Sequence, residues 1–341
     1  MVFLHTVKDV SNNDYYSFLN NESYFFIYLL NFIGAFAVPC FFMLSGAFIL
    51  DNPKNADYRY FYKKAFKKIA IPTLVFAFIY FLYNEIPLLI RLYEGKTNYF
   101  FLISPLKELL RGSANGHLWY ITVLIGIYCF IPFIVIIKEK VDNKNFSWFC
   151  WLYFIVAMLS GSSSSFYFHW SIGKIACYME FVLVGFQIRE YYKTRKSNKI
   201  ALLFIFLVFI FTLIAGYMQF KADYAILIKN GLFKPPYRSA NNFSLFVILS
   251  SIFIFSGFSK LNMENELPKL MNTISQITLY IYLIHRPFCE LAPLIFLKYY
   301  SFKIGVLPYS ILITLSVFTI SLILTEFYKT IADKLLTVAD K

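Results

Sequence analysis

Long apolar stretches alternate with short polar connectors along almost the whole chain. A transmembrane helix needs about 20 mostly apolar residues, because that length crosses the hydrocarbon core of a bilayer. Two of the stretches, 147–160 and 173–188, are shorter than this. The pattern predicts an all-α, polytopic membrane helix bundle with about nine complete transmembrane helices. The segments expected to cross are 23–50, 69–90, 117–137, 147–160, 173–188, 200–220, 241–258, 273–297 and 306–328.

The first residues, Val2-Phe3-Leu4, have the character of the end of an apolar helix. They are too few to form the apolar region of a signal peptide, and polar residues follow at once. We therefore expect the C-terminal remnant of a first helix before the nine complete ones. On this interpretation, residues 1–341 form a single transmembrane domain that is truncated at its N-terminus and has no appended soluble domain.

The composition favours lipid, rather than one soluble core, as the surroundings of this chain. Of its 341 residues, 59% are hydrophobic and 21% are aromatic, and the mean hydropathy is +0.60. A soluble protein of this size has too little interior to bury so much apolar surface. The net charge of +13 is shared among connectors instead of forming one amphipathic face, so we expect no nucleic-acid partner.

The distribution of basic residues between connectors predicts the orientation in the membrane. Alternate connectors form two sets, and one set carries 19 Lys and Arg residues against 11 in the other. The positive-inside rule places the richer set, together with the C-terminus, in the cytoplasm and places His5 near the outer face. The richer set consists of 51–68, 138–146, 189–199, 259–272 and 329–341.

The cysteines and glycines carry no motif of their own. None of the five cysteines has the paired spacing of a zinc site or of a disulfide framework, and no Walker-type glycine loop is present. We expect neither a bound metal nor a bound cofactor.

Three histidines stand beside or within apolar segments. His5 follows the remnant helix and is a candidate general base toward a hydroxyl, since imidazole titrates near neutral pH; a histidine at the membrane interface is the alternative. His117 opens a span together with Trp119, where an aromatic belt is the alternative interpretation. His5 and His117 share one side of the predicted bundle, so both are expected to line one pocket.

His285 and Arg286 lie near the middle of the predicted 273–297 span. Charge is costly there and usually faces a cavity or an ionic partner. A structural ion pair of Arg286 with Glu290 or with Glu180 is the alternative to a functional role.

A basic cluster follows the 23–50 segment, which itself contains the small-residue pair Ser45 and Gly46. The cluster either anchors the chain against anionic lipid or binds the phosphates of a nucleotide-type donor. Ser45 and Gly46 are expected to serve close helix packing, since no nucleophile-elbow motif surrounds Ser45. Pro39 is expected to kink the same helix. The cluster consists of Arg59, Lys63, Lys64, Lys67 and Lys68.

Five of these segments, in this order, resemble the acyltransferase 3 family of integral membrane acyltransferases. The resemblance runs over nearly the whole chain. It covers Val2 to Thr6 as the end of a first helix, Val38 to Gly46 as the second-helix signature, and Phe61 to Pro72 as the basic entry to the third helix. It also covers His117-Leu118-Trp119-Tyr120 and the segment from Ile274 to His285. The family pattern has ten helices, and it has an arginine eleven positions before the histidine that corresponds to His5, where this chain has no residue.

The resemblance implies a membrane-bound O-acyltransferase, a transferase of groups other than amino-acyl groups. It implies acetyl-CoA as the donor substrate, and a hydroxyl of a cell-surface polysaccharide or lipid-linked glycan as the acceptor. His5 would be catalytic, and the basic cluster would hold the CoA phosphates. The acceptor side would be formed by His117, Trp119, His285, Arg286 and Glu180.

Two other functions remain open at this point. A polysaccharide exporter or flippase would also use many spans and intramembrane charge, and an inactive, truncated paralogue would keep the fold alone. In each case we expect a multi-pass protein of the inner or plasma membrane with a cytoplasmic C-terminus.

Overall fold

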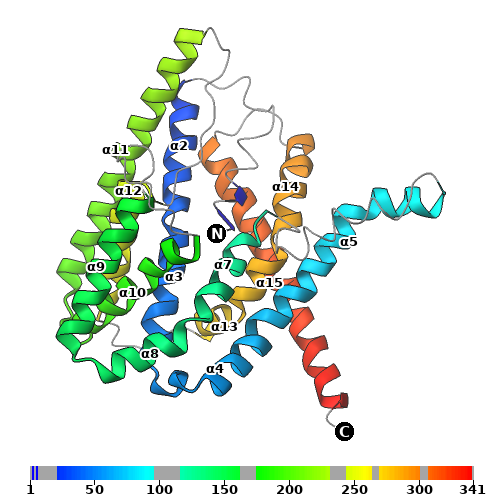
Figure 1. The fold of residues 1–341 in the computed structure, drawn as a ribbon. Helices are drawn as coiled ribbons and strands as arrows, with labels where there is room; N and C mark the ends of the chain where they lie inside the picture. Colours follow the sequence, from blue (N-terminus) through cyan, green and yellow to red (C-terminus); the bar gives the residue numbers. More distant parts are fainter. Residues whose placement is uncertain are drawn as a thin grey trace.

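The computed structural model describes residues 2–3, 5–6, 21–95, 116–161, 174–230, 243–262, 269–299 and 306–339. Within these ranges the regular structure is helical, as the apolar pattern predicts, and each of the expected apolar segments falls on a helix or on a broken pair of helices (Figure 1). A 3₁₀ turn, Pro53–Ala56, and a π-helical turn, Phe66–Ala70, flank α4. The α-helices are α2 Asn21–Ala35, α3 Ala37–Ile49, α4 Tyr58–Ala65, α5 Ile71–Tyr93, α7 Trp119–Tyr128, α8 Ile131–Lys140, α9 Asn143–Gly161, α10 Lys174–Tyr192, α11 Asn198–Asn230, α12 Leu245–Lys260, α13 Lys269–Ile284, α14 Arg286–Tyr299 and α15 Val306–Ala339.

Prolines account for three breaks within the apolar segments. A proline has no N–H for the carbonyl four residues earlier, and its ring clashes with that carbonyl. Pro39 follows the break between α2 and α3, Pro132 follows the bend of 43° between α7 and α8, and Pro287 follows the break between α13 and α14. The predictions of unbroken helices over 117–137 and 273–297 are therefore wrong in detail, whereas the predicted kink near Pro39 is present.

Glycines allow α3 and α10 to pack backbone to backbone. A Cβ atom at Gly46 would overlap the carbonyl of Val182, and one at Gly185 would overlap the backbone of Met43. The hydroxyl of Ser45 donates to the carbonyl of Phe41 in its own helix, at 3.1 Å. The geometry at Gly46 is that of helix packing, and α3 and α10 form the centre of the largest buried cluster.

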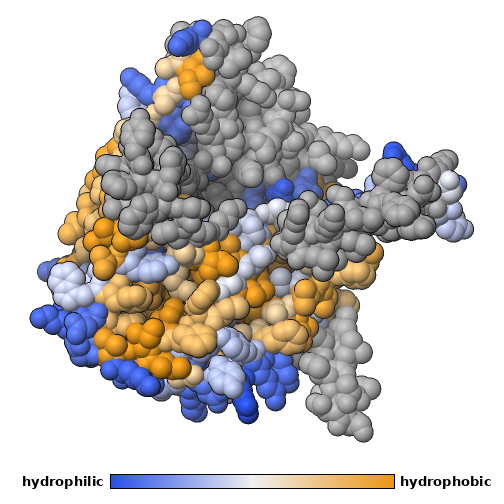
Figure 2. Space-filling view, in the orientation of Figure 1, coloured by the Kyte–Doolittle hydropathy of each residue, from blue (hydrophilic) through white to orange (hydrophobic). Residues whose placement is uncertain are grey.

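Four helices within the described ranges are long and apolar enough to cross a membrane, and the bent pair α7–α8 makes five if it counts as one span. The prediction of nine complete spans stays a prediction. Hydrophobic residues cover much of the side of the bundle, and hydrophilic residues gather at its lower end (Figure 2). The four spans are Phe25–Ile49, Tyr58–Pro87, Asn198–Ile226 and Pro308–Tyr328.

The basic connectors lie together at that lower end. Lys138 Nζ donates to the carbonyl of Leu50 at 3.0 Å, and Lys196 Nζ donates to the carbonyl of Ser259 at 2.7 Å. Arg189 Nη1 lies 3.0 Å from a carboxylate oxygen of Asp51. These contacts join the connectors 51–68, 138–146, 189–199 and 259–262 into one surface, which we call the basic face.

Candidate functional site

Three histidines from three separate parts of the chain meet inside the bundle. His5 belongs to the N-terminal segment, His117 lies two residues before the start of α7, and His285 lies at the break between α13 and α14. The ring centroid of His5 is 5.2 Å from that of His285 and 6.3 Å from that of His117. The rings of His117 and His285 are 5.4 Å apart. We call these three residues the histidine cluster.

The N-terminal segment is held against α15 next to this cluster. Thr6 is fully buried, and its hydroxyl lies 3.0 Å from the hydroxyl of Thr314 on α15. The same hydroxyl lies 2.6 Å from the carbonyl of Val2, to which it donates. Thr6 thereby fixes the position of its neighbour, His5.

The helix break at Pro287 positions the two buried histidines. Because Pro287 has no N–H, the carbonyl of Leu283 is free of the usual helix bond. It accepts a hydrogen bond of 2.5 Å from the Tyr80 hydroxyl. The backbone of Leu283 also hydrogen-bonds the imidazole of His117. One freed carbonyl therefore ties α5 and the start of α7 to the break that carries His285.

The tautomer of His285 follows from its backbone contact. Its Nδ1 lies 2.6 Å from the carbonyl of Tyr282. A carbonyl can only accept, so Nδ1 carries the proton, and in the neutral ring Nε2 has a free lone pair. Nε2 is buried and has no hydrogen-bond partner among the described residues. His285 is thus arranged to accept a proton or a hydrogen bond at Nε2.

Two tyrosines complete the surroundings of the cluster, and the sequence did not single out either as a site residue. The ring of Tyr80 lies 5.0 Å from that of His117 in an edge contact, and the Tyr282 hydroxyl donates to the carbonyl of His117. The Tyr282 ring lies 5.5 Å from His285. Tyr282 belongs to a family-like segment, but nothing in the apolar 69–90 stretch distinguishes Tyr80 from its aromatic neighbours.

A cavity of about 820 Å³ extends from the basic face toward the histidine cluster. Lys67 and Lys68 line it at the basic face, and Tyr282 lines it where the rings of His117 and His285 lie. Val2 and Phe3 line it as well, and they stand three and two positions before His5. The cavity is otherwise largely apolar, with side chains of α7, α13 and α15 in its wall.

The structure divides the predicted basic cluster in two. Lys67 and Lys68 reach the cavity, whereas Arg59, Lys63 and Lys64 lie exposed on α4. Arg59 Nε donates to the hydroxyl of Tyr58 at 3.2 Å, and Lys64 Nζ lies 5.5 Å from the centre of a tyrosine ring. Only two of the five predicted phosphate-binding residues therefore line the cavity.

The remaining predicted site residues lie at different places. Arg286 Nε is 3.0 Å from a carboxylate oxygen of Glu290, which is one of the two ion pairs considered from the sequence. Glu180 on α10 is fully buried, and its carboxylate oxygens have no hydrogen-bond partner in the described part of the chain. Trp119 packs against Tyr178 in the core, with their ring centroids 5.4 Å apart.

Three neighbouring imidazoles raise the question of a metal ion. Structural and catalytic metal sites need three or four ligand atoms that converge on one point. Across the described ranges, no group of three or more His, Cys, Asp or Glu side chains has the arrangement of a metal site. The chemistry that the cluster itself offers is proton transfer by imidazole.

A family model described as an acyltransferase domain matches residues 1–326. The chain matches no curated protein and no solved structure.

Proposed function

The chain belongs to the acyltransferase 3 family, and from this membership we propose that it is a membrane-bound O-acyltransferase for surface glycans. The donor is acetyl-CoA, and the acceptor is a hydroxyl of a cell-surface polysaccharide or a lipid-linked glycan. It is a transferase of groups other than amino-acyl groups, and it uses acetyl-CoA as a substrate, with no bound cofactor.

One observation carries the proposal: a single cavity is lined by Lys67 and Lys68 at one end and approaches the histidine cluster at the other. Along α13 its lining runs from Ile274 to Tyr282, which at 1.5 Å per residue is about 12 Å. Two ammonium groups at the mouth suit the phosphates of CoA. An apolar interior suits the thioester arm that must reach the imidazoles.

His5 is the proposed general base. It is only half-buried, whereas His117 and His285 are fully buried, so its imidazole has the best access to a substrate. The acceptor hydroxyl attacks the thioester carbonyl carbon as His5 takes the hydroxyl proton. The C–S bond then breaks, the thiolate leaves with the electron pair, and the proton passes from His5 to the sulfur. The products are the acetyl ester and free CoA.

His117 and His285 are positioning residues in this proposal. His285 presents an acceptor nitrogen next to His5 and is itself held by the Tyr282 carbonyl. The backbone of Leu283 holds His117. Fixed neighbours of this kind keep a general base in a productive orientation, and misplacement by about 1 Å can cost a factor of 100 in rate.

The orientation in the membrane follows from the charge distribution. The positive-inside rule places the basic face, and with it the C-terminus, in the cytoplasm of a cell with this protein in its inner or plasma membrane. Acetyl-CoA would then enter the cavity from the cytoplasm. The cavity would carry its thioester toward His5, which the connector pattern places nearer the opposite side.

The proposal is tested by incubating membranes that contain the protein with acetyl-CoA labelled in its acetyl group. We expect the label to appear in glycan and to be released by mild base, as an O-acetyl ester is. Movement of glycan across the membrane without any labelling would instead support an exporter. No labelling and no movement would support an inactive paralogue.

We predict that His5→Ala lowers the rate of transfer by a factor of about 100 to 10,000, the usual contribution of general base catalysis. The amount of protein in the membrane and its melting temperature should stay close to those of the unsubstituted chain, because His5 is only half-buried. The initial rate of label transfer and a detergent melting curve measure the two effects. Full activity of His5→Ala would remove His5 from the mechanism.

A further inference from the structure

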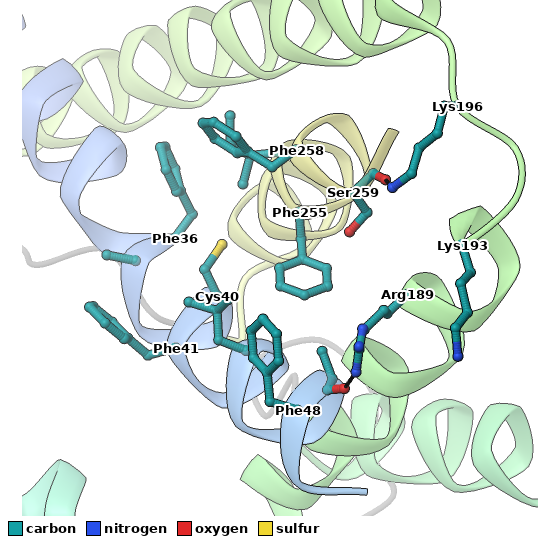
Figure 3. A pocket seen from close by; sticks show the side chains of 14 residues that line it. Phe36, Cys40, Phe41, Phe48, Arg189, Lys193, Lys196, Phe255, Phe258 and Ser259 are labelled. Atoms are coloured by element: carbon teal, nitrogen blue, oxygen red, sulfur yellow. Dashed lines mark hydrogen bonds between the residues drawn. The ribbon is translucent and has the colours of Figure 1, made fainter. Parts of the chain in front are cut away.

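A second cavity, of about 720 Å³, lies between α3, α10 and α12 (Figure 3). Five phenylalanine rings line it, and Figure 3 shows Phe36 and Phe41 on the side away from Lys193 and Lys196, with Phe48 beside Arg189. The proposed acyl transfer does not use it. Its phenylalanines are Phe36, Phe41, Phe48, Phe255 and Phe258.

Charge is confined to the end of this cavity at the basic face. Arg189, Lys193 and Lys196 line that end. Arg189 and Lys193 share the carboxylate of Asp51, at 3.0 Å and 3.8 Å, and Lys193 also lies 3.4 Å from Glu190. Lys196 Nζ donates to a backbone carbonyl, which leaves its charge without an acidic partner among these contacts. The end of the cavity therefore keeps one net positive charge.

The length of the cavity matches one leaflet of a bilayer. Its lining runs from Phe36, the residue before α3, to Phe48 on α3, which spans about 18 Å at 1.5 Å per residue. Half of a hydrocarbon core is about 15 Å thick. The cations stand at the end where the helices meet the basic face, which is the level of lipid phosphates, and the phenylalanines follow the helix toward the middle of the bundle.

We propose that this cavity is a binding site for an anionic phospholipid of the leaflet at the basic face. The phosphate lies against Lys193 and Lys196, and one acyl chain lies along Phe48, Phe41 and Phe36. A single net charge in one place, combined with an apolar groove one leaflet long, fits an amphiphile with a charged head and a long tail. Basic side chains at this level of a membrane protein attract anionic head groups.

The test uses the full chain, purified in detergent and freed of lipid. It is titrated with phosphatidylglycerol or with phosphatidylcholine of identical acyl chains, and native mass spectrometry counts the lipids bound. We expect phosphatidylglycerol to bind about tenfold more tightly than phosphatidylcholine. The double variant Lys193→Gln, Lys196→Gln should lose about tenfold in affinity for phosphatidylglycerol and little for phosphatidylcholine.

The matched control is Lys140→Gln, Lys144→Gln, which removes the same charge from the basic face at two exposed residues outside the cavity. It should bind both lipids as the unsubstituted chain does. A second variant, Leu44→Trp, keeps every charge but fills the groove from a half-exposed position. We expect it to weaken the binding of both lipids while the melting temperature without lipid stays unchanged.

Equal binding of the two lipids, or an equal loss in the control variant, would overturn the proposal in favour of general attraction to the basic face. Unchanged binding by Leu44→Trp would show that the groove is not the site. Competition by inorganic phosphate at millimolar concentration would assign the site to a free anion instead. None of these outcomes depends on acyl transfer, so the site and the enzymatic proposal stand or fall separately.

Discussion

At the scale of single residues, the candidate site depends on the backbone carbonyls just before the α13–α14 break, one of which, that of Leu283, is left free by Pro287. The Tyr282 carbonyl fixes the proton of His285 on Nδ1, and the Leu283 backbone holds both Tyr80 and His117. Each of these hydrogen bonds contributes only about 0.5–1.5 kcal/mol to stability. Their larger effect is on catalysis, because they set the directions of imidazole nitrogens.

The Tyr80 hydroxyl allows this argument to be tested at one atom. We predict that Tyr80→Phe lowers the turnover rate by about tenfold and the stability by about 1 kcal/mol, since it removes one of the two hydrogen bonds at Leu283 and loosens His117. The matched control is Tyr62→Phe, which removes a similar bond of 2.7 Å to the carbonyl of Cys129 at a more exposed break. Initial rates and melting curves of the two variants give the comparison. Equal effects on turnover would contradict a positioning role for Tyr80.

Much of the candidate site could be predicted as separate residues but not as a cluster. His5, His117 and His285 each place an imidazole, a possible proton acceptor, within or beside an apolar segment, and this is visible in the sequence. Their meeting depends on the packing of the N-terminal segment, α7 and the α13–α14 break, which no local pattern encodes. Tyr80 escapes notice for the same reason, because its value comes from a carbonyl some 200 residues away.

At the scale of elements, the broken helix α13–α14 presents the site. The break frees the Leu283 carbonyl and turns His285 toward the other two histidines. Apolar length alone predicted one continuous helix over 273–297, because hydropathy is insensitive to a single proline. The proline pattern carries the missing information, since Pro39, Pro132 and Pro287 each follow a break.

Restoring the backbone N–H at the α13–α14 break should damage the candidate site. In Pro287→Ala the new N–H competes for the Leu283 carbonyl with Tyr80 and His117, and the two helices tend to join. We predict a fall in turnover of at least tenfold, with the melting temperature unchanged or raised. Pro132→Ala is the control, because it makes the same change at the α7–α8 bend. Turnover and melting curves should separate them; a Pro287→Ala enzyme as active as Pro132→Ala would show that the break does not matter for catalysis.

At the scale of the whole molecule, one cavity begins at the basic face and extends to Tyr282, whose ring lies beside those of His117 and His285. The sequence predicted both ends of this arrangement and placed them on opposite sides of the membrane, but it left the route between them open. The structure shows an apolar space between α7, α13 and α15 that ends at Lys67 and Lys68. The neighbouring pair Lys63 and Lys64 does not line this cavity, and only the three-dimensional arrangement reveals this difference.

We predict that Lys67→Gln, Lys68→Gln raises the KM for acetyl-CoA about tenfold and leaves the turnover rate at saturating donor nearly unchanged. Removing ground-state binding far from the reacting atoms has this effect. The control is Lys63→Gln, Lys64→Gln, which removes the same charge from exposed positions on α4 that do not line the cavity. Donor titrations at low and at high salt provide the measurement, because screening should reduce the difference between the pairs.

If both double variants raise the KM equally, the cations act through the general potential of the basic face. If neither does, they anchor the chain in the membrane, and the donor phosphates bind elsewhere. Only a selective effect of Lys67 and Lys68 is consistent with entry of the donor through this cavity.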